Sequence, residues 1–302
     1  MRTLIFAALA LIAPASAQTL KDILAPNAAV QKAAGGFQFT EGPVWSPKGY
    51  LLFSDVPPGI IYRLDAKAGK AVPFRQPSRH SNGLTFDKQG RLIACESEGT
   101  LTRTEKDGRV TTLAARYEGK ALNSPNDVTV RSDGNVYFTD PTYGMRPPNV
   151  PTAREPQLGF RGLYRVAPDG KITLVDRDFR QPNGVALSPD EKRLYANDTE
   201  GGFIRVYDLA PDGTPGKGRI FAEMKGPGDG APDGMKVDRR GNIFCTGPGG
   251  VWVFSSEARL LGKISAPEVP ANVAFGDKDM KTLYMTARTG LYKVRVKTAG
   301  KR

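Results

Sequence analysis

One unit, repeated six times, constrains the fold of this chain more than any other feature of its sequence. Each copy opens with a polar residue, continues with alternating apolar residues, passes through a turn and ends with a second apolar run. This pattern predicts a β-hairpin. The six hairpins are EGPVWSPKGYLLFSD (41–55), NGLTFDKQGRLIACE (82–96), NDVTVRSDGNVYFTD (126–140), NGVALSPDEKRLYAND (183–198), DGMKVDRRGNIFCTG (233–247) and NVAFGDKDMKTLYMTA (272–287).

A third strand follows every hairpin, and a fourth strand follows all but the last. The third strands are IIYRLD (60–65), TLTRTE (100–105), GLYRVA (162–167), FIRVYDL (203–209), GVWVFS (250–255) and LYKVRV (291–296). Units of four strands that recur every 40 to 60 residues are typical of propeller blades. The sequence therefore predicts an all-β fold: a six-bladed β-propeller with four antiparallel strands per blade, formed as a single domain over residues 18–302.

The distribution of Gly and Pro supports an all-β fold. The chain has 34 Gly and 24 Pro among 302 residues, and beyond residue 17 the longest stretch without either is Asp277–Thr289. Helical bundles and doubly wound α/β folds need several longer uninterrupted segments. Short strands joined by frequent turns fit this spacing better.

The sixth copy lacks a fourth strand of its own, because only the polar segment Lys297–Arg302 follows its third strand. An open ring would leave blade edges unpaired. We therefore expect a segment around Ala28–Ala34, just before the first hairpin, to supply the missing strand and close the ring. An independent N-terminal helix over Asn27–Ala34 is the alternative interpretation.

Residues 1–17 have the features of a signal peptide. Arg2 is followed by an apolar stretch over Leu4–Ile12 and by the small residues Ala15, Ser16 and Ala17. This pattern predicts cleavage before Gln18 and export, with the mature protein in the periplasm or secreted. No other segment is apolar enough to span a membrane.

Export would permit a disulfide between the two cysteines, Cys95 and Cys245. They fall in the second and fifth copies, which lie on opposite sides of a ring of six. We therefore expect two free thiols.

The chain carries 43 Lys and Arg against 31 Asp and Glu, a formal net charge of +12. The basic residues are scattered and no nucleic-acid-binding motif is present, so we expect no nucleic-acid partner. A basic field that attracts anionic sugars or sugar acids is the alternative. The sequence does not determine the oligomeric state.

The first residue of each repeat bears a carboxylate or a carboxamide. These residues are Glu41, Asn82, Asn126, Asn183, Asp233 and Asn272. Asn-Gly and Asp-Gly are common turn formers, but Glu is not, and repeat symmetry places all six at one height around the axis. Oxygen donors that converge on an axis suit a hard divalent cation.

Glu41 and Asp233 would neutralise such a cation, and Asn126 and Asn183 would add neutral oxygens. Ca²⁺ is the expected ion; Mg²⁺, Mn²⁺ or Fe²⁺ could use the same donors, and Zn²⁺ fits this ligand set less well. Asn82 and Asn272 are expected to bond to neighbouring backbone instead.

The blade register also predicts which loops surround this site. Connections from each second strand to the third, and from each blade to the next, lie on the face where the inner strands start. The longest is Pro141–Arg161, a proline-rich segment that is either a lid or a surface insertion. Tyr143 at its start is a candidate pocket wall or a packed loop aromatic. His80 on the same face is a candidate substrate contact, an auxiliary base or a structural loop residue.

Several segments resemble the gluconolactonase/regucalcin family of six-bladed propellers, and the resemblance covers most of residues 37–296. These segments are FTEGPVWSP, SNGLTFDKQGRLIACE, LNSPNDV with FTDPTYG, QPNGVALSPDE and PDGMKVD. The resemblance implies Glu41, Asn126, Asn183 and Asp233 as metal ligands, Asp233 as the acid–base residue and Asn126 as a further substrate contact. Regucalcin-type members have a substrate-contacting Arg where this chain has Ser124, so the sugar preference is not transferred.

The combined features predict metal-dependent hydrolysis of a sugar lactone to its aldonic acid, as in gluconolactonases. The cation would polarise the lactone carbonyl, and Asp233 would carry the proton. No G-x-S-x-G sequence indicates a serine hydrolase. Two alternatives remain: a non-catalytic binding propeller whose axial cation is structural, and a broader metal-dependent lactonase or esterase.

Overall fold

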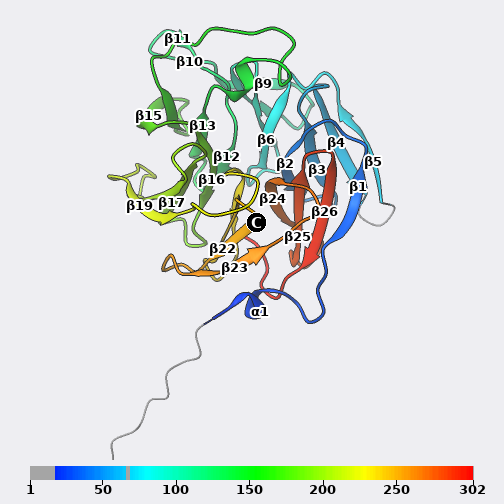
Figure 1. Ribbon diagram of the computed structural model, residues 1–302. Coiled ribbons are helices and arrows are strands. Elements are labelled where there is room, and N and C mark those ends of the chain that lie inside the picture. The colour runs from blue at the N-terminus through cyan, green and yellow to red at the C-terminus, as the bar shows by residue number, and fades with distance from the viewer. Residues whose placement is uncertain (1–17, 66–68, 302) are drawn as a thin grey trace, which may run out of the picture.

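Six four-stranded antiparallel sheets surround a central axis in the computed structural model, which describes residues 18–65 and 69–301 (Figure 1). The first strands of the six repeats contact one another in a closed ring, β2–β6–β12–β16–β20–β24 and back to β2. This arrangement confirms the predicted six-bladed propeller and places the first strand of each repeat at the axis.

The first three blades follow the chain in order, each with its strands paired from inside to outside. Blade 1 contains β2 (Thr40–Trp45), β3 (Leu51–Asp55), β4 (Ile60–Asp65) and β5 (Lys70–Arg75). Blade 2 contains β6 (Ser81–Phe86), β7 (Leu92–Glu96), β8 (Thr100–Thr104) and β9 (Val110–Ala114). Blade 3 contains β12 (Val128–Val130), β13 (Val136–Asp140), β14 (Arg161–Val166) and β15 (Ile172–Phe179).

The last three blades repeat this order. Blade 4 contains β16 (Pro182–Leu187), β17 (Arg193–Asp198), β18 (Phe203–Asp208) and β19 (Arg219–Glu223). Blade 5 contains β20 (Met235–Val237), β21 (Ile243–Gly247), β22 (Gly250–Phe254) and β23 (Leu260–Ile264). Blade 6 contains β24 (Pro270–Gly276), β25 (Thr282–Ala287) and β26 (Gly290–Arg295). A small hairpin, β10 (Arg116–Tyr117) and β11 (Lys120–Ala121), joins blades 2 and 3.

The ring closes with a strand from the beginning of the chain. β1 (Gln31–Gly35) pairs antiparallel with β26, so that Gln31 lies opposite Lys293 and Gly35 opposite Gly290. Figure 1 shows this blue strand beside the red one. The predicted closure is confirmed, and the alternative helix over Asn27–Ala34 is wrong. The only α-helix among the described residues is the single turn α1 (Leu20–Ile23), which packs Ile23 into the core of blades 5 and 6.

The hydrophobic core consists of clusters between neighbouring blades. Between blades 5 and 6, for example, the rings of Phe244 and Phe275 meet edge to face with centroids 5.1 Å apart. All five residues of each of β3, β7, β13 and β21 are buried. The second strands are covered by sheets on both faces, and so each of these four begins with at least three consecutive apolar residues.

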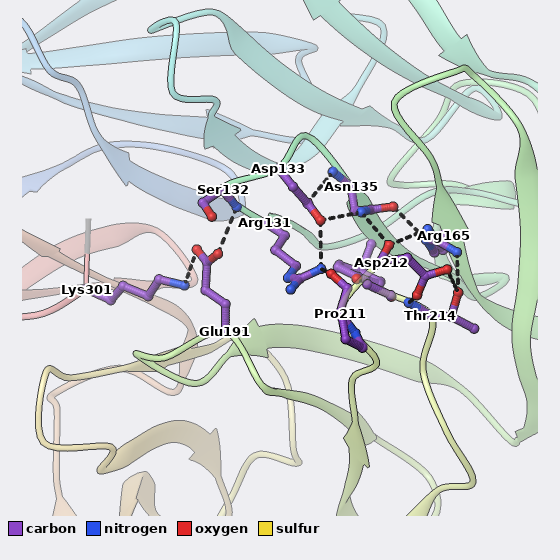
Figure 2. Close-up of polar contacts among 12 residues, drawn as sticks. Arg131, Ser132, Asp133, Asn135, Arg165, Glu191, Pro211, Asp212, Thr214 and Lys301 are labelled. Carbon is purple, nitrogen blue, oxygen red and sulfur yellow. Dashed lines mark hydrogen bonds and ion pairs between the residues drawn. The ribbon is translucent and has the colours of Figure 1, made fainter.

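On the face where the inner strands end, a polar network links blades 3 and 4 to the C-terminal segment (Figure 2). Arg131 Nη1 donates to Asp133 Oδ2 (2.7 Å) and to the Pro211 carbonyl (3.0 Å). Glu191 accepts from the Ser132 backbone N–H (3.0 Å) and from Lys301 Nζ (2.8 Å). Lys301 is thereby fixed at the mouth of the channel opposite the candidate site.

No helix among the described residues is long and apolar enough to cross a membrane. The predicted signal peptide, residues 1–17, lies outside the described residues and stays a prediction.

Both cysteines are buried and unbridged. Burial raises the pKa of the Cys245 thiol to about 12 and that of the Cys95 thiol well above its ordinary value. A thiol that is both inaccessible and protonated does not react as a nucleophile. We therefore predict no reaction with a thiol reagent in the folded protein and two reactive groups after unfolding without reductant. Thiol titration measures both numbers; a count of zero after unfolding would contradict the blade register.

Candidate functional site

We call the first residues of the six repeats, named above, the ring residues. The inner strands approach one another so closely that little but glycine fits directly after most of them. A Cβ atom on Gly42 would lie 1.9 Å from the Asn82 carbonyl oxygen, and one on Gly184 would lie 2.2 Å from the Asp233 carbonyl oxygen. Gly83 donates its backbone N–H to the Asn126 carbonyl (2.7 Å). The glycine that follows four of the six ring residues, Gly42, Gly83, Gly184 or Gly234, is therefore required by inter-blade packing. Turn formation alone does not explain it, and this packing holds the first residues of the repeats near the axis.

Glu41 lies in β2 and is 2% exposed. Its Oε2 accepts hydrogen bonds from the Gly42 backbone N–H (3.0 Å) and from Asn272 Nδ2 (3.2 Å). Asn272 Oδ1 in turn accepts from the Val273 backbone N–H (2.8 Å). Asn272 is thus satisfied locally, as expected, and it positions the Glu41 carboxylate.

Asn183 and Asp233 each present a buried oxygen atom with no hydrogen-bond partner among the described residues. Asn183 is 3% exposed, and its Nδ2 donates to Thr199 Oγ1 (3.1 Å), so its Oδ1 is directed away from that contact. Asp233 is partly exposed as a residue, but its Oδ1 is inaccessible and unpaired. Buried polar atoms without partners are rare in folded proteins and indicate a missing ion or water.

Asn82 Oδ1 is also buried and unpaired among these residues, so the expectation that Asn82 would bond to neighbouring backbone is wrong at this atom. Asn126 is 6% exposed, and its backbone is fixed by the bond from Gly83 and by its own N–H, which donates to the Thr139 carbonyl (2.8 Å). The ring therefore offers more oxygen donors than the four that the sequence selected.

Burial and mutual repulsion perturb the carboxylates. Burial raises the pKa of Glu41 to about 7, with the charge of Asp127 contributing. Burial, then the charges of Glu41 and Asp127, raise the pKa of Asp233 well above its ordinary value, and a hydrogen bond from Asn183 opposes them. Glu41, Asn183 and Asp233 thus interact directly in one cluster. Buried carboxylates that repel each other favour a bound cation.

Asp127 is a third carboxylate of this cluster, which sequence reasoning missed. It is 1% exposed, and its oxygens accept from the Val128 backbone N–H (2.9 Å) and the Val185 backbone N–H (3.3 Å). The ammonium group of Lys236 lies 3.7 Å from its Oδ2. Because both Asp127 oxygens are occupied, we do not count Asp127 among the ligands.

Asp127 and Lys236 depart from the repeat pattern, and this departure would have revealed the pair in the sequence. Asp127 stands where four of the other copies have Gly, and Lys236 stands where the other copies have Val, Thr or Ala. Those uncharged side chains and Lys236 line a cavity of about 430 Å³ at the opposite mouth of the channel. Lys236 reaches from that channel toward the carboxylate cluster.

The donor set fits an oxygen-preferring dication. Two carboxylates and two or three amide oxygens are hard ligands suited to Ca²⁺ or a similar ion. Among residues 18–65 and 69–301 there is no group of three or more His, Cys, Asp and Glu side chains arranged to hold a metal. A cation here would therefore depend on the asparagine oxygens as much as on the carboxylates.

The Pro141–Arg161 connection is anchored over the site face. It begins with a short 3₁₀ helix, η1 (Tyr143–Met145), in which the Gly144 backbone N–H donates to Ser124 Oγ (3.1 Å). Arg154 Nη2 donates to the carbonyls of Ser97 (2.6 Å) and Asn123 (2.7 Å). The connection is therefore tied down at several points, and Ser124 is one of its anchors.

Tyr143 and His80 differ in their relation to the cluster. Burial raises the pKa of Tyr143, the hydrogen bond to Thr199 lowers it, and the charges of Glu200 and Asp233 raise it, so the phenol lies beside the cluster. His80 Nδ1 donates to the Val56 carbonyl (3.0 Å), and its backbone adopts a left-handed conformation (φ 54°). That geometry favours a structural role for His80 in its loop.

A second cavity, of about 350 Å³, lies on the site face and is lined by Asp233 together with Arg288, Gln38 and segments of the connections to blades 5, 6 and 1. Its volume is at the small end of the range for ligand pockets and suits a molecule the size of a sugar lactone.

Comparison with known proteins agrees with this geometry. Residues 39–289 match the model of the SMP-30/Gluconolactonase/LRE-like region. A gluconolactonase of Zymomonas mobilis is 34% identical over 93% of this chain and 85% of its own. A pentonolactonase of Haloferax volcanii is 29% identical over 83% of this chain and 81% of its own. A solved structure described as a gluconolactonase of Xanthomonas campestris superposes with a TM-score of 0.84 at 33% identity, covering 93% of this chain and 94% of that one. The chain belongs to the SMP-30/gluconolactonase/LRE-like family.

Proposed function

We propose that the protein hydrolyses a sugar lactone to the corresponding aldonic acid with the help of one divalent cation, Ca²⁺ in the first instance. Its family and its named relatives make it a lactonase. The cation, the sugar and the roles of individual residues are our proposal.

One observation carries the cation requirement: two buried oxygen atoms, Asn183 Oδ1 and Asp233 Oδ1, have no hydrogen-bond partner beside a buried carboxylate, Glu41. Leaving such groups unsatisfied costs about 1–3 kcal/mol each. The presence of several such atoms around one axis supports a bound ligand that compensates them. Glu41, Asn126, Asn183 and Asp233 would hold the ion, and Asn82 Oδ1 is available as a fifth donor.

A bound dication would polarise the lactone carbonyl and stabilise negative charge on its oxygen. Asp233 then acts as general base, accepting a proton from the water whose oxygen bonds to the carbonyl carbon. When the ring C–O bond breaks, Asp233 returns that proton to the leaving alkoxide, and the product is the open-chain hydroxy acid. Glu41, fixed by Asn272 and Gly42, supplies charge without taking part in proton transfer.

Asn126 and Tyr143 are the proposed substrate contacts on the site face. Tyr143 lies in the Pro141–Arg161 connection, and its phenol interacts with Thr199 and with the charge of Asp233, so we assign it a place at the edge of the substrate site. His80 is proposed to shape the loop that carries it and to make no essential contact.

The deciding experiment is a substrate panel with and without chelator. Sugar lactones, aryl esters and a phosphotriester are assayed by pH-stat on the same preparation. Chelator-sensitive hydrolysis of sugar lactones alone supports the proposal. Turnover of all three classes indicates a broader hydrolase, and no turnover with retained cation binding indicates a binding propeller. Export remains part of the proposal, and N-terminal sequencing of the mature protein tests it.

We predict that Asp233→Asn and Glu41→Gln differ in their rescue by excess metal. Both changes remove a ligand charge and weaken cation binding. Only Asp233→Asn also removes the base, which is worth roughly 10²–10⁴-fold in rate. Lactone hydrolysis measured against Ca²⁺ concentration should therefore recover further for Glu41→Gln. Equal recovery would leave Asp233 a ligand only.

We predict that Ca²⁺ raises the melting temperature more at pH 8 than at pH 5.5. The pKa of Glu41 is about 7 in the cation-free fold, above its ordinary value of 4.5. Its contribution to the stability of the cation-free fold is therefore present below about pH 4.5 and is lost as the pH rises through about 7. At pH 5.5 a cation must displace the proton, whereas at pH 8 it meets a carboxylate. Thermal unfolding with and without Ca²⁺ measures the effect; Glu41→Gln should show a smaller difference between the two pH values.

We predict that His80→Ala retains Ca²⁺ binding and loses less than the ~10²-fold in rate expected for a lost acid–base residue. Among the described residues, the one hydrogen bond of its side chain is the bond to the Val56 carbonyl. Calorimetric Ca²⁺ titration and lactone hydrolysis on the same variant check this. Loss of activity with binding intact would restore His80 to the mechanism.

A further inference from the structure

The hairpin turn between β25 and β26 carries a positively charged residue, an arginine, at the edge of the candidate site. Arg288 lies at this turn, and it lines the same 350 Å³ cavity as Asp233. It is the one basic residue among those that line this cavity. A ligand that fills the cavity therefore lies against both Asp233, the proposed general base, and Arg288.

The backbone of this turn is fixed to the strand that carries Glu41. The Arg288 carbonyl accepts from the Thr40 backbone N–H (2.8 Å) and from Thr40 Oγ1 (3.1 Å). Thr40 is 0% exposed and immediately precedes Glu41. Arg288 is therefore placed relative to the carboxylate cluster by buried contacts, although its own side chain is exposed.

The side chain of Arg288 has no hydrogen-bond or ion-pair partner within residues 18–65 and 69–301. Glu268, which precedes β24 and bonds to this hairpin, is occupied: it accepts from the Thr289 backbone N–H (2.8 Å), from Thr289 Oγ1 (2.8 Å) and from the Tyr292 hydroxyl (2.7 Å). Arg295, at the other end of β26, is by contrast paired with Asp279 (2.6 Å). The guanidinium of Arg288 is available to a ligand.

We propose that Arg288 is a specificity-determining residue that recognises an anionic group on the lactone, remote from the ring carbonyl. This inference rests on the proposed function and adds the substrate class: lactones of sugar acids or sugar derivatives that carry a carboxylate, sulfonate or phosphate. The planar guanidinium binds such groups through two parallel hydrogen bonds. Ser124 cannot serve as this contact, because its hydroxyl donates to the Pro141 carbonyl (2.7 Å) and accepts from Gly144.

The test compares kcat/KM for D-glucono-1,5-lactone, which is neutral, with that for D-glucaro-1,4-lactone and 6-phospho-D-glucono-1,5-lactone, which carry a carboxylate and a phosphate. The wild-type protein should prefer at least one anionic lactone by tenfold or more, and salt should reduce the preference. Arg288→Gln should lose tenfold or more on that substrate and less than threefold on the neutral one. Arg288→Lys keeps the positive charge but lacks the planar guanidinium with its two parallel donors. Its loss of kcat/KM on the anionic substrate should therefore be intermediate.

Arg116→Gln is the matched control. Arg116 is an exposed arginine in the β10–β11 hairpin of the same face, bonded through Nη1 to the Gly119 carbonyl (2.9 Å). Arg116→Gln should leave the preference for anionic lactones unchanged. A wild-type enzyme without preference, or an equal loss on neutral and anionic lactones in Arg288→Gln, would overturn the proposal.

A binding measurement separates this inference from the proposed function. Calorimetry compares D-glucarate with D-gluconate on the Ca²⁺-loaded protein. Tighter binding of the dianion that disappears in Arg288→Gln supports the anion contact even if no lactone is hydrolysed, in which case the proposed function fails alone. Equal binding of the two acids by wild type and variant counts against Arg288.

Discussion

Every feature of the candidate site depends on how closely six inner strands approach one axis. Gly42, Gly83, Gly184 and Gly234 each lie where a side chain would collide with the next blade, within 1.9–2.5 Å of its atoms. Without those contacts the ring residues would lie farther from the axis and their oxygens would not converge. The same packing excludes water from Glu41 and from the unpaired oxygens of Asn183 and Asp233, and this exclusion is what perturbs the carboxylates.

The electrostatics of the channel follow from that exclusion. Glu41, Asp127 and Asp233 lie close enough for their charges to interact, and Lys236 is the nearby cation that partly offsets them. Three negative charges against one positive charge leave a balance that one dication would neutralise. This charge balance supports the proposed site, in which oxygen ligands alone would hold the ion and Asp233 would be both a ligand and a proton carrier.

Much of this could be predicted from the sequence, because the repeat fixes register. The register placed Glu41, Asn126, Asn183 and Asp233 at one height, and the missing strand of the sixth copy required closure by the N-terminal segment. Asp127 and Lys236 are visible in the sequence as departures from the repeat pattern, but their proximity, 3.7 Å between the ammonium group and Asp127 Oδ2, is a property of the folded ring. Asn82 looked like a residue that would bond locally. The turn at Arg288 and the anchoring of the Pro141–Arg161 connection through Ser124 depend on contacts outside the hairpin unit, which a single repeat does not encode.

The pairing of β1 with β26 has a consequence for the order of folding. The strand that completes blade 6 is made first and its partner is made last, so the ring cannot close until nearly the whole chain has been synthesised. Until then β1 is an unpaired edge, and its exposed Gln31 and Lys32 give it a polar character that discourages pairing with other chains. A chain truncated before β26 would keep five blades and an open gap. Assembly of the site is thus coupled to closure of the ring. Only a chain that includes β26 forms the circular arrangement that brings the oxygens of blades 1, 3, 4 and 5 together.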